Sequence, residues 1–122
     1  MSRIAVVEDN PDNRLLLHAM LDGIYELEDY ETGTDAVAGI IRNPADLVLL
    51  DISLPGMDGL QVLRHLRDSA LTARLPVIAL TAHAMAGDRE RFLKAGFDGY
   101  LTKPIVDEIE LLGAIERQLI RN

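Results

Sequence analysis

Two patterns of apolar and polar residues alternate along this chain. Short runs dominated by Val, Ile and Leu are followed by longer segments in which apolar residues recur every three or four positions. The first pattern is typical of strands and the second of amphipathic helices. The pattern predicts five strands, each followed by a helix. The predicted strands cover residues 3–7, 25–30, 46–51, 76–81 and 97–101.

The predicted helices begin and end at residues that suit helix termini. Asn10 is a good cap for a helix whose first residue is Pro11. Gly23 and Gly96 are expected to end two helices as left-handed caps. We expect Thr34 to open the second helix of the chain.

Strands that alternate with helices predict an α/β fold, in which a parallel sheet carries helices on both faces. Because crossover connections between parallel strands are right-handed, few topologies remain. Residues 47–50 and 76–80 are unbroken apolar runs, as in strands buried on both faces, whereas 25–30 alternates with acidic residues like an edge strand. With no linker or repeat in 122 residues, we expect one domain over 1–122.

Composition narrows the function classes. The absence of Cys excludes disulfides and thiol chemistry and is consistent with a reducing compartment. A formal net charge of -8 argues against non-specific binding to nucleic acid or anionic membranes. Acidic residues come too early for a signal peptide, and no apolar run approaches the ~20 residues of a membrane span. We therefore expect a soluble, cytoplasmic protein.

Polar residues lie at the ends of four predicted strands. Glu8 and Asp9 follow the first strand, and Asp51 ends the third. Thr81 ends the fourth strand, and Lys103 follows the fifth. The carboxyl ends of parallel strands meet at one edge of the sheet, where α/β proteins bind ligands. The sequence therefore predicts that three carboxylates, a hydroxyl and an ammonium share one cleft.

Three neighbouring carboxylates require a cation. Two carboxylates about 4 Å apart repel by about 4 kcal/mol at an effective dielectric constant of 20. Oxygen ligands that leave room for water and phosphate suit Mg²⁺. Lys103, Thr81 and backbone N–H groups of the loop after Asp51 suit a phosphoryl anion. Asp51 is then a candidate nucleophile that forms an aspartyl phosphate.

Short motifs at these strand ends carry a family resemblance. They are Val7-Glu8-Asp9-Asn10, Leu50-Asp51 with Leu54-Pro55-Gly56-Met57-Asp58-Gly59, Thr81-Ala82 and Lys103-Pro104. Together, in this order and spacing, they make the chain resemble the response-regulator receiver domains of two-component signalling over essentially its whole length. The resemblance implies a flavodoxin-like, three-layer, doubly wound five-stranded parallel sheet with strand order 2-1-3-4-5 and five helices.

The resemblance also implies a role for each acidic residue of the site. Asp51 is the expected phosphoacceptor, and Mg²⁺ is the expected cofactor. The expected ligands of the metal are Glu8, Asp9, Asp51 and the backbone carbonyl of Ser53.

The remaining site residues are expected to sense the phosphoryl group. The resemblance implies that Lys103 and Thr81 contact it, and that Tyr100 rotates into the space that Thr81 vacates. This rotation alters the face made by the fourth helix, fifth strand and fifth helix. The Lys103-Pro104 peptide is expected to be cis, as is usual in the family. His83, two residues after Thr81, is a hypothetical modulator of water access to the acyl phosphate.

Partners follow from the same resemblance. We expect a histidine kinase or histidine phosphotransfer protein to dock on the Leu15 face of the first helix, near Pro104, and to donate the phosphoryl group. Signalling then passes to a downstream protein, with the chain a monomer or a weak homodimer through the fourth helix, fifth strand and fifth helix. We expect no enzymatic activity beyond the chain's own phosphorylation and dephosphorylation. The Met1 start favours a stand-alone regulator over a receiver excised from a hybrid kinase.

Two other protein classes share part of this pattern. A Mg²⁺-dependent phosphatase with an aspartyl-phosphate intermediate typically has a general acid two residues after its nucleophile, where this chain has Ser53, and usually carries a cap domain. A flavodoxin-like cofactor binder needs a hydroxyl- and glycine-rich phosphate loop after the first strand. Here the acidic Glu8 and Asp9 would repel a phosphate at that position.

Overall fold

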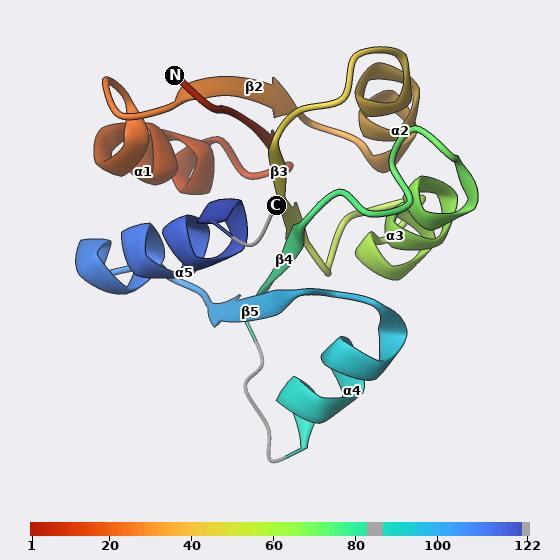
Figure 1. Cartoon of the computed structure of the whole chain (residues 1–122). Coiled ribbons are helices and arrows are strands. Elements are labelled where there is room, and N and C mark those ends of the chain that lie inside the picture. The colour runs from red at the N-terminus through yellow and green to blue at the C-terminus, as the bar shows by residue number, and fades with distance from the viewer. Residues whose placement is uncertain (83–86, 121–122) are drawn as a thin grey trace.

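The computed structural model describes residues 1–82 and 87–120, and within them five strands alternate with five helices (Figure 1). The strands are β1 (Arg3–Val7), β2 (Glu26–Tyr30), β3 (Leu47–Asp51), β4 (Val77–Thr81) and β5 (Gly99–Thr102). The helices are α1 (Pro11–Leu21), α2 (Gly33–Arg42), α3 (Gly59–Asp68), α4 (Asp88–Ala95) and α5 (Glu108–Ile120). All strand pairs are parallel in the order β2-β1-β3-β4-β5, which confirms the predicted fold.

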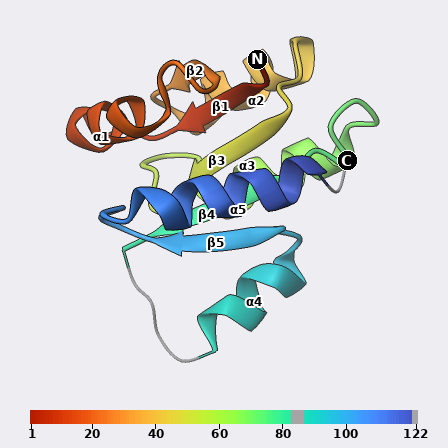
Figure 2. The same ribbon diagram turned by 60° about the vertical axis from the view of Figure 1, so that its left-hand side comes forward.

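Helices cover both faces of the sheet, so the protein has three layers. α1 and α5 lie on one face, and α2 and α3 lie on the other (Figure 1). In the turned view of Figure 2, α5 crosses in front of the sheet, while α4 lies beyond β5. Each face has its own apolar core, one including residues of α2, α3 and α4 and the other including residues of α1 and α5.

The central strand β3 shows why its apolar run has no polar break. Val48 and Leu50 pack into the core beneath α2 and α3, whereas Leu47 and Leu49 pack into the core beneath α1 and α5. Successive strand residues point to opposite faces, and here both faces are covered. Burying each such side chain contributes about 1.5–3 kcal/mol. The strand therefore holds its last residue, Asp51, in a fixed place.

Two predicted helix termini are confirmed. The Asn10 side chain caps α1 and accepts hydrogen bonds from the backbone N–H groups of Asp12 (2.8 Å) and Asn13 (3.3 Å). Gly96 ends α4 with φ at 115°, in the left-handed region that only glycine adopts without strain.

Two other helix boundaries differ from the prediction. Thr34 does not open α2, because the helix begins at Gly33, after a cap by Thr32 whose side chain accepts a hydrogen bond from the N–H of Asp35. α1 ends on an extended cap at Asp22, and Gly23 with its φ of 87° lies in the following turn.

The last strand is shorter than predicted at its beginning. Phe97 belongs to the core, where its ring meets the Phe92 ring edge-on at 5.9 Å between centroids. The N–H of Asp98 donates to the carbonyl of Val77, which leads the chain into the sheet at Gly99. The prediction that the strand begins at Phe97 is therefore wrong, because an apolar residue that packs against a helix has the same pattern as the first residue of a strand.

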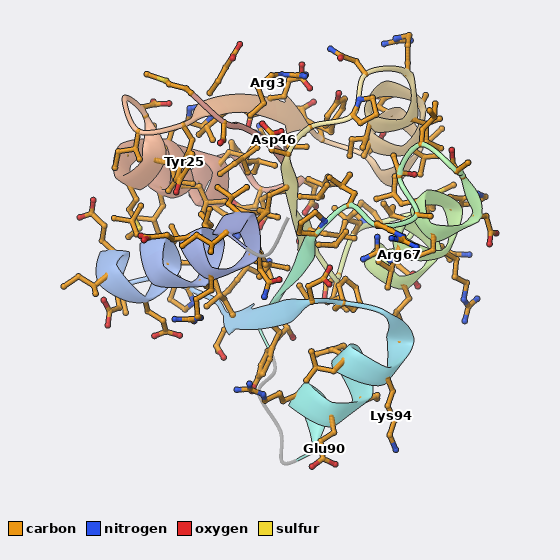
Figure 3. The ribbon with its side chains drawn as sticks, viewed as in Figure 1. Arg3, Tyr25, Asp46, Arg67, Glu90 and Lys94 are labelled. Carbon is orange, nitrogen blue, oxygen red and sulfur yellow. The ribbon has the colours of Figure 1, made fainter. Side chains whose placement is uncertain are left out.

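Two arginines hold the edge of the sheet at which the strands begin, Arg67 through its side chain and Arg3 through its backbone N–H. Arg67 of α3 donates to the carbonyls of Thr72, Leu75 and Gly96 and pairs with Asp98 at 3.1 Å. At the other side of this edge, Asp46 accepts a hydrogen bond from the N–H of Arg3 (2.7 Å), and both residues lie beside the start of β3 (Figure 3). These contacts fix the loops that precede the strands.

None of the helices within 1–82 and 87–120 has the length and apolarity that crossing a lipid bilayer requires.

Candidate functional site

The predicted polar residues meet at the carboxyl edge of the sheet. Lys103 lies between two carboxylates, with its Nζ 3.1 Å from Glu8 Oε1 and 3.1 Å from Asp51 Oδ1. These residues follow or end β1, β3 and β5, which are far apart in sequence but converge in a parallel sheet. Glu8 is 0% exposed and Asp51 is 1% exposed, so both charges lie beneath the surface.

A third carboxylate completes the acidic cluster. Asp9 is exposed, and one ligand oxygen from each of Glu8, Asp9 and Asp51 lies within 4.8 Å of the others. One ammonium, that of Lys103, faces two of these three carboxylates. The remaining negative charge and the hard oxygen donors fit a divalent cation such as Mg²⁺. Asp9 would hold such an ion from the solvent side, and Glu8 and Asp51 from the buried side.

Three donors orient the buried carboxylate of Glu8. Its Oε2 accepts a hydrogen bond from the N–H of Asn10 (3.2 Å), and its Oε1 accepts from Asn13 Nδ2 (3.2 Å) and Lys103 Nζ (3.1 Å). The Arg14 guanidinium donates to the Glu8 backbone carbonyl at 2.8 Å. Burial raises the pKa of Glu8 and the neighbouring Asp51 raises it further, while Asn10 and Lys103 act in the opposite direction.

The charge of Lys103 is maintained by its acidic neighbours. Burial lowers the pKa of this ammonium, but hydrogen bonds and charges from Asp51 and Glu8 outweigh burial and leave the pKa raised. With 13% of its side chain exposed, Lys103 is a cation held at the mouth of the acidic cluster. Such a group is suited to contact an anion bound beside Asp51.

The loop after β3 folds tightly around Asp51. The N–H of Ser53 donates to Asp51 Oδ1 at 3.0 Å, and Gly56 takes a left-handed φ of 72° in the turn that follows. A side chain at Gly59 would place its Cβ 2.5 Å from the Asp51 carbonyl oxygen. Only glycine therefore allows the first residue of α3 to approach the end of β3 this closely.

The fourth and fifth strands bring the remaining predicted residues to the same region. Thr81 ends β4 with 3% exposure, and its carbonyl accepts a hydrogen bond from the N–H of Lys103 at 2.7 Å. Tyr100 lies on β5, partly buried, with its ring 5.9 Å from that of Phe92 on α4. The peptide bond between Lys103 and Pro104 is cis. His83, the hypothetical modulator, lies outside the described residues.

The sequence interpretation missed two residues that support the site. Asn13 and Arg14 lie in the first turn of α1, and their contacts with Glu8 depend on how the helix starts after β1. The available signal was Asn10, whose cap fixes the start of the helix and therefore directs these side chains back toward the strand end.

Comparisons with known proteins bear on this arrangement. The family model described as the response regulator receiver domain matches residues 4–116. This chain belongs to the response regulator receiver domain family. The matched residues include the acidic cluster and Lys103, so the candidate site lies within the part of the chain that the family model covers.

Individual relatives agree with this assignment. The receiver domain is 42% identical over 106 residues to the signal transduction histidine-protein kinase BarA of Escherichia coli K12, covering 86% of this chain and 12% of that protein. It thus spans about an eighth of that curated relative. In solved structures it resembles the receiver domain of sensor histidine kinase PA1611 from Pseudomonas aeruginosa PAO1 (39% identity, TM-score 0.87, 97% of both chains), which has a magnesium ion coordinated in its active site cleft. A sensor protein from Polaromonas sp. JS666 matches with 30% identity and TM-score 0.88 over 98% of this chain and 97% of that chain.

Proposed function

We propose that this receiver domain is a phosphorylation-controlled switch in a two-component phosphorelay, with Asp51 as phosphoacceptor. The observation that supports this most directly is Lys103 between Glu8 and Asp51 at 3.1 Å from each, beside a third carboxylate. A buried carboxylate that lies beside an ammonium and beside further carboxylates able to hold a cation is suited to receive a phosphoryl group.

In the proposed transfer, an oxygen of Asp51 attacks the phosphorus of a donor phosphohistidine. The new O–P bond forms as the N–P bond of the donor breaks, and the imidazole leaves with the bonding electron pair and takes up a proton. The N–H of Ser53, 3.0 Å from Asp51 Oδ1, holds the carboxylate in one orientation. Lys103 stabilises the negative charge of the phosphoryl oxygens, and the Thr81 hydroxyl supplies a hydrogen bond.

The cation that we assign to the site is Mg²⁺, held by the carboxylates of Glu8, Asp9 and Asp51 with the backbone carbonyl of Ser53. When bound, Mg²⁺ supplies positive charge that neutralises the phosphoryl oxygens during transfer. Its role here is supported by the hard oxygen donors within 4.8 Å of one another and by the magnesium in the PA1611 receiver domain. The chain's catalysis is confined to its own phosphorylation and dephosphorylation.

The phosphoryl group would be sensed by Thr81 and Tyr100. Thr81 moves toward the new oxygens, and Tyr100 rotates toward the space left behind. Tyr100 lies against α4 through Phe92 and lines a cavity of about 200 Å³ that α5 residues Glu110 and Arg117 also line. The ring therefore touches the face that would carry the signal to a downstream protein or to a second copy. A complete switch from 1:99 to 99:1 needs about 5.5 kcal/mol of differential stabilisation.

The donor would be a histidine kinase or a histidine phosphotransfer protein that docks beside the acidic cluster. Exposed apolar side chains support this placement: Leu15 on α1 is 71% exposed, and Val106 and Ile109 near the start of α5 are 82% and 83% exposed. Val106 also lines a groove of about 440 Å³ that includes Lys103. A Leu15→Glu variant should accept phosphate from acetyl phosphate normally but from a protein donor slowly; equal rates with the protein donor would contradict this docking site.

The first experiment is the intact mass of the protein after incubation with acetyl phosphate and Mg²⁺. Wild type should gain one labile phosphoryl group, while Asp51→Asn and wild type in EDTA should gain none. Absence of the adduct in wild type that binds Mg²⁺ would mean an interaction module that works without phosphorylation. Continuous phosphate release with turnover would instead favour the phosphatase.

A further inference from the structure

One side chain at the site has no role in the function proposed above. Asn13 points its Nδ2 at Glu8 Oε1 from 3.2 Å, and it lines a small cavity together with Glu8, Lys103 and Ile105. Because a carboxylate only accepts hydrogen bonds, the amide must turn its NH₂ group toward Glu8. Asn13 is therefore a committed donor to a carboxylate that is 0% exposed.

The position of Asn13 in its helix makes this contact unusual. Asn13 is the third residue of α1, and Gln61 is the third residue of α3. Gln61 forms a capping box, because its side chain accepts a hydrogen bond from the backbone N–H of Asp58, the cap of its own helix, at 3.0 Å. The Asn13 side chain instead reaches beyond its cap, Asn10, to a side chain of the site. The third residue therefore caps its own helix in α3, whereas in α1 it contacts a residue of the candidate site.

A neutral donor is the chemistry that this position requires. Glu8 Oε1 already faces the Lys103 ammonium at 3.1 Å. A second cation beside the same oxygen would repel a metal ion bound there, whereas an amide orients the carboxylate without adding charge. Lys103 is also 3.1 Å from Asp51, and if it turns toward a phosphoryl group, Asn13 remains as a donor on Oε1.

We propose that Asn13 is a positioning residue that holds the Glu8 carboxylate in its Mg²⁺-binding orientation. The inference rests on the proposed function, since it assumes that Glu8, Asp9 and Asp51 bind Mg²⁺. Groups that orient metal ligands through hydrogen bonds typically change metal affinity by about 10–100-fold when they are removed. Asn13 acts on one of three carboxylates, so we expect the lower end of that range.

The test is a Mg²⁺ titration of the unphosphorylated protein, in which the backbone amide NMR signals of Asn10 and Ser53 report binding. The variant Asn13→Leu keeps the shape of the side chain and removes the donor. Its Kd for Mg²⁺ should rise about tenfold. Because NMR shifts report folded molecules, a loss of stability alone leaves this Kd unchanged. Asn13→Ala serves the same purpose if the leucine variant does not fold.

Two further variants separate orientation from other effects. Gln61→Leu removes the side-chain hydrogen bond at the matched position of α3 and should leave the Kd for Mg²⁺ at its wild-type value. In a Glu8→Gln background, Asn13→Leu should have no additional effect on the Kd, because the carboxylate that it positions is gone.

The outcomes distinguish this inference from the function on which it rests. A wild-type protein that binds no Mg²⁺ would overturn the proposed function itself. Wild-type binding with an unchanged Kd in Asn13→Leu would overturn the positioning role alone. Equal losses in the Glu8 and Glu8→Gln backgrounds would also overturn it, because Asn13 would then act independently of Glu8. A tenfold loss confined to the Glu8 background would establish it.

Discussion

The edge of the sheet at which the strands begin and the edge at which they end differ in how their acidic residues are paired. At the edge where the strands begin, Asp98 is matched with Arg67, and Asp98 Oδ2 also accepts a hydrogen bond from the N–H of Val77 at 2.8 Å. At the edge where they end, three carboxylates lie close together, and Lys103 pairs with the two buried ones, Glu8 and Asp51.

Stability and chemistry are thus assigned to different edges of the sheet. Arg67 reaches three carbonyls in two separate loops, so it joins segments that the sheet alone does not tie together. The carboxyl edge instead holds unbalanced negative charge, which weakens the free protein and favours a cation. The edge where the strands begin holds the loops in place, and the edge where they end is suited to bind a cation.

The largest expected effect concerns the edge that holds the loops. Arg67→Met should lower the free energy of unfolding by about 3 kcal/mol, since the carbonyls of Leu75 and Gly96 lose the Arg67 donor and Asp98 loses its cation. Urea denaturation measures this loss. The matched control is Arg64→Met, an exposed arginine of the same helix, which should change little. The affinity of Arg67→Met for Mg²⁺ should stay at the wild-type value; a large change would mean that the two edges are coupled.

The next effect concerns the binding edge. Addition of Mg²⁺ at 100 times its Kd should raise the free energy of unfolding of wild type by about 2.7 kcal/mol, because the ion binds the folded cluster alone. Asp9→Asn should lose most of this gain, since it removes the exposed carboxylate of the cluster. Thermal unfolding with Mg²⁺ or EDTA checks both values. An Asp9→Asn variant stabilised as strongly as wild type would remove Asp9 from the metal site.

The smallest effect tests the same charge pattern at the surface. His18 lies between two carboxylates, 3.1 Å from Asp22 and 2.7 Å from Asp29, much as Lys103 lies between Glu8 and Asp51. Burial lowers the pKa of His18, but Asp29 and Asp22 outweigh it and the pKa is raised. This contribution to stability is complete below the unfolded pKa of about 6.5 and is lost as pH rises through the higher folded pKa.

Solvent screens this surface pair, so the free energy of unfolding should fall by about 0.5 kcal/mol more in wild type than in His18→Gln as pH rises. Urea denaturation on both sides of the transition measures the difference. The matched control is His65→Gln, an exposed histidine of α3, which should keep the wild-type pH dependence. Identical pH profiles for wild type and His18→Gln would show that the two carboxylates do not stabilise the imidazolium.

The boundaries of the elements were predicted least well where a local signal competed with packing. Phe97 looked like a strand residue because it is apolar and precedes Gly99, but its ring packs on Phe92 and the strand starts later. Thr34 and Thr32 are both plausible caps, and the structure uses Thr32 because its hydroxyl meets the N–H of Asp35. Such choices depend on neighbours that a residue pattern does not contain.

The residue pattern alone was enough to predict the sheet and the convergence of Glu8, Asp51 and Lys103. Apolar runs buried on both faces require a parallel sheet with helices on each side, and the carboxyl ends of its strands must then share one edge. The residues that end those strands are therefore brought together by topology alone, however far apart they are along the chain.

The hydrogen bonds and close contacts that hold these side chains depend on the packing of the folded chain. Asn13 reaches Glu8 because the Asn10 cap sets where α1 starts, and Gly59 lets α3 approach Asp51 within a distance that no side chain permits. Arg67 finds its carbonyls across loops that are close only in the folded chain. Hydrogen bonds are formed over about 3 Å, so they depend on positions that only the packed structure defines.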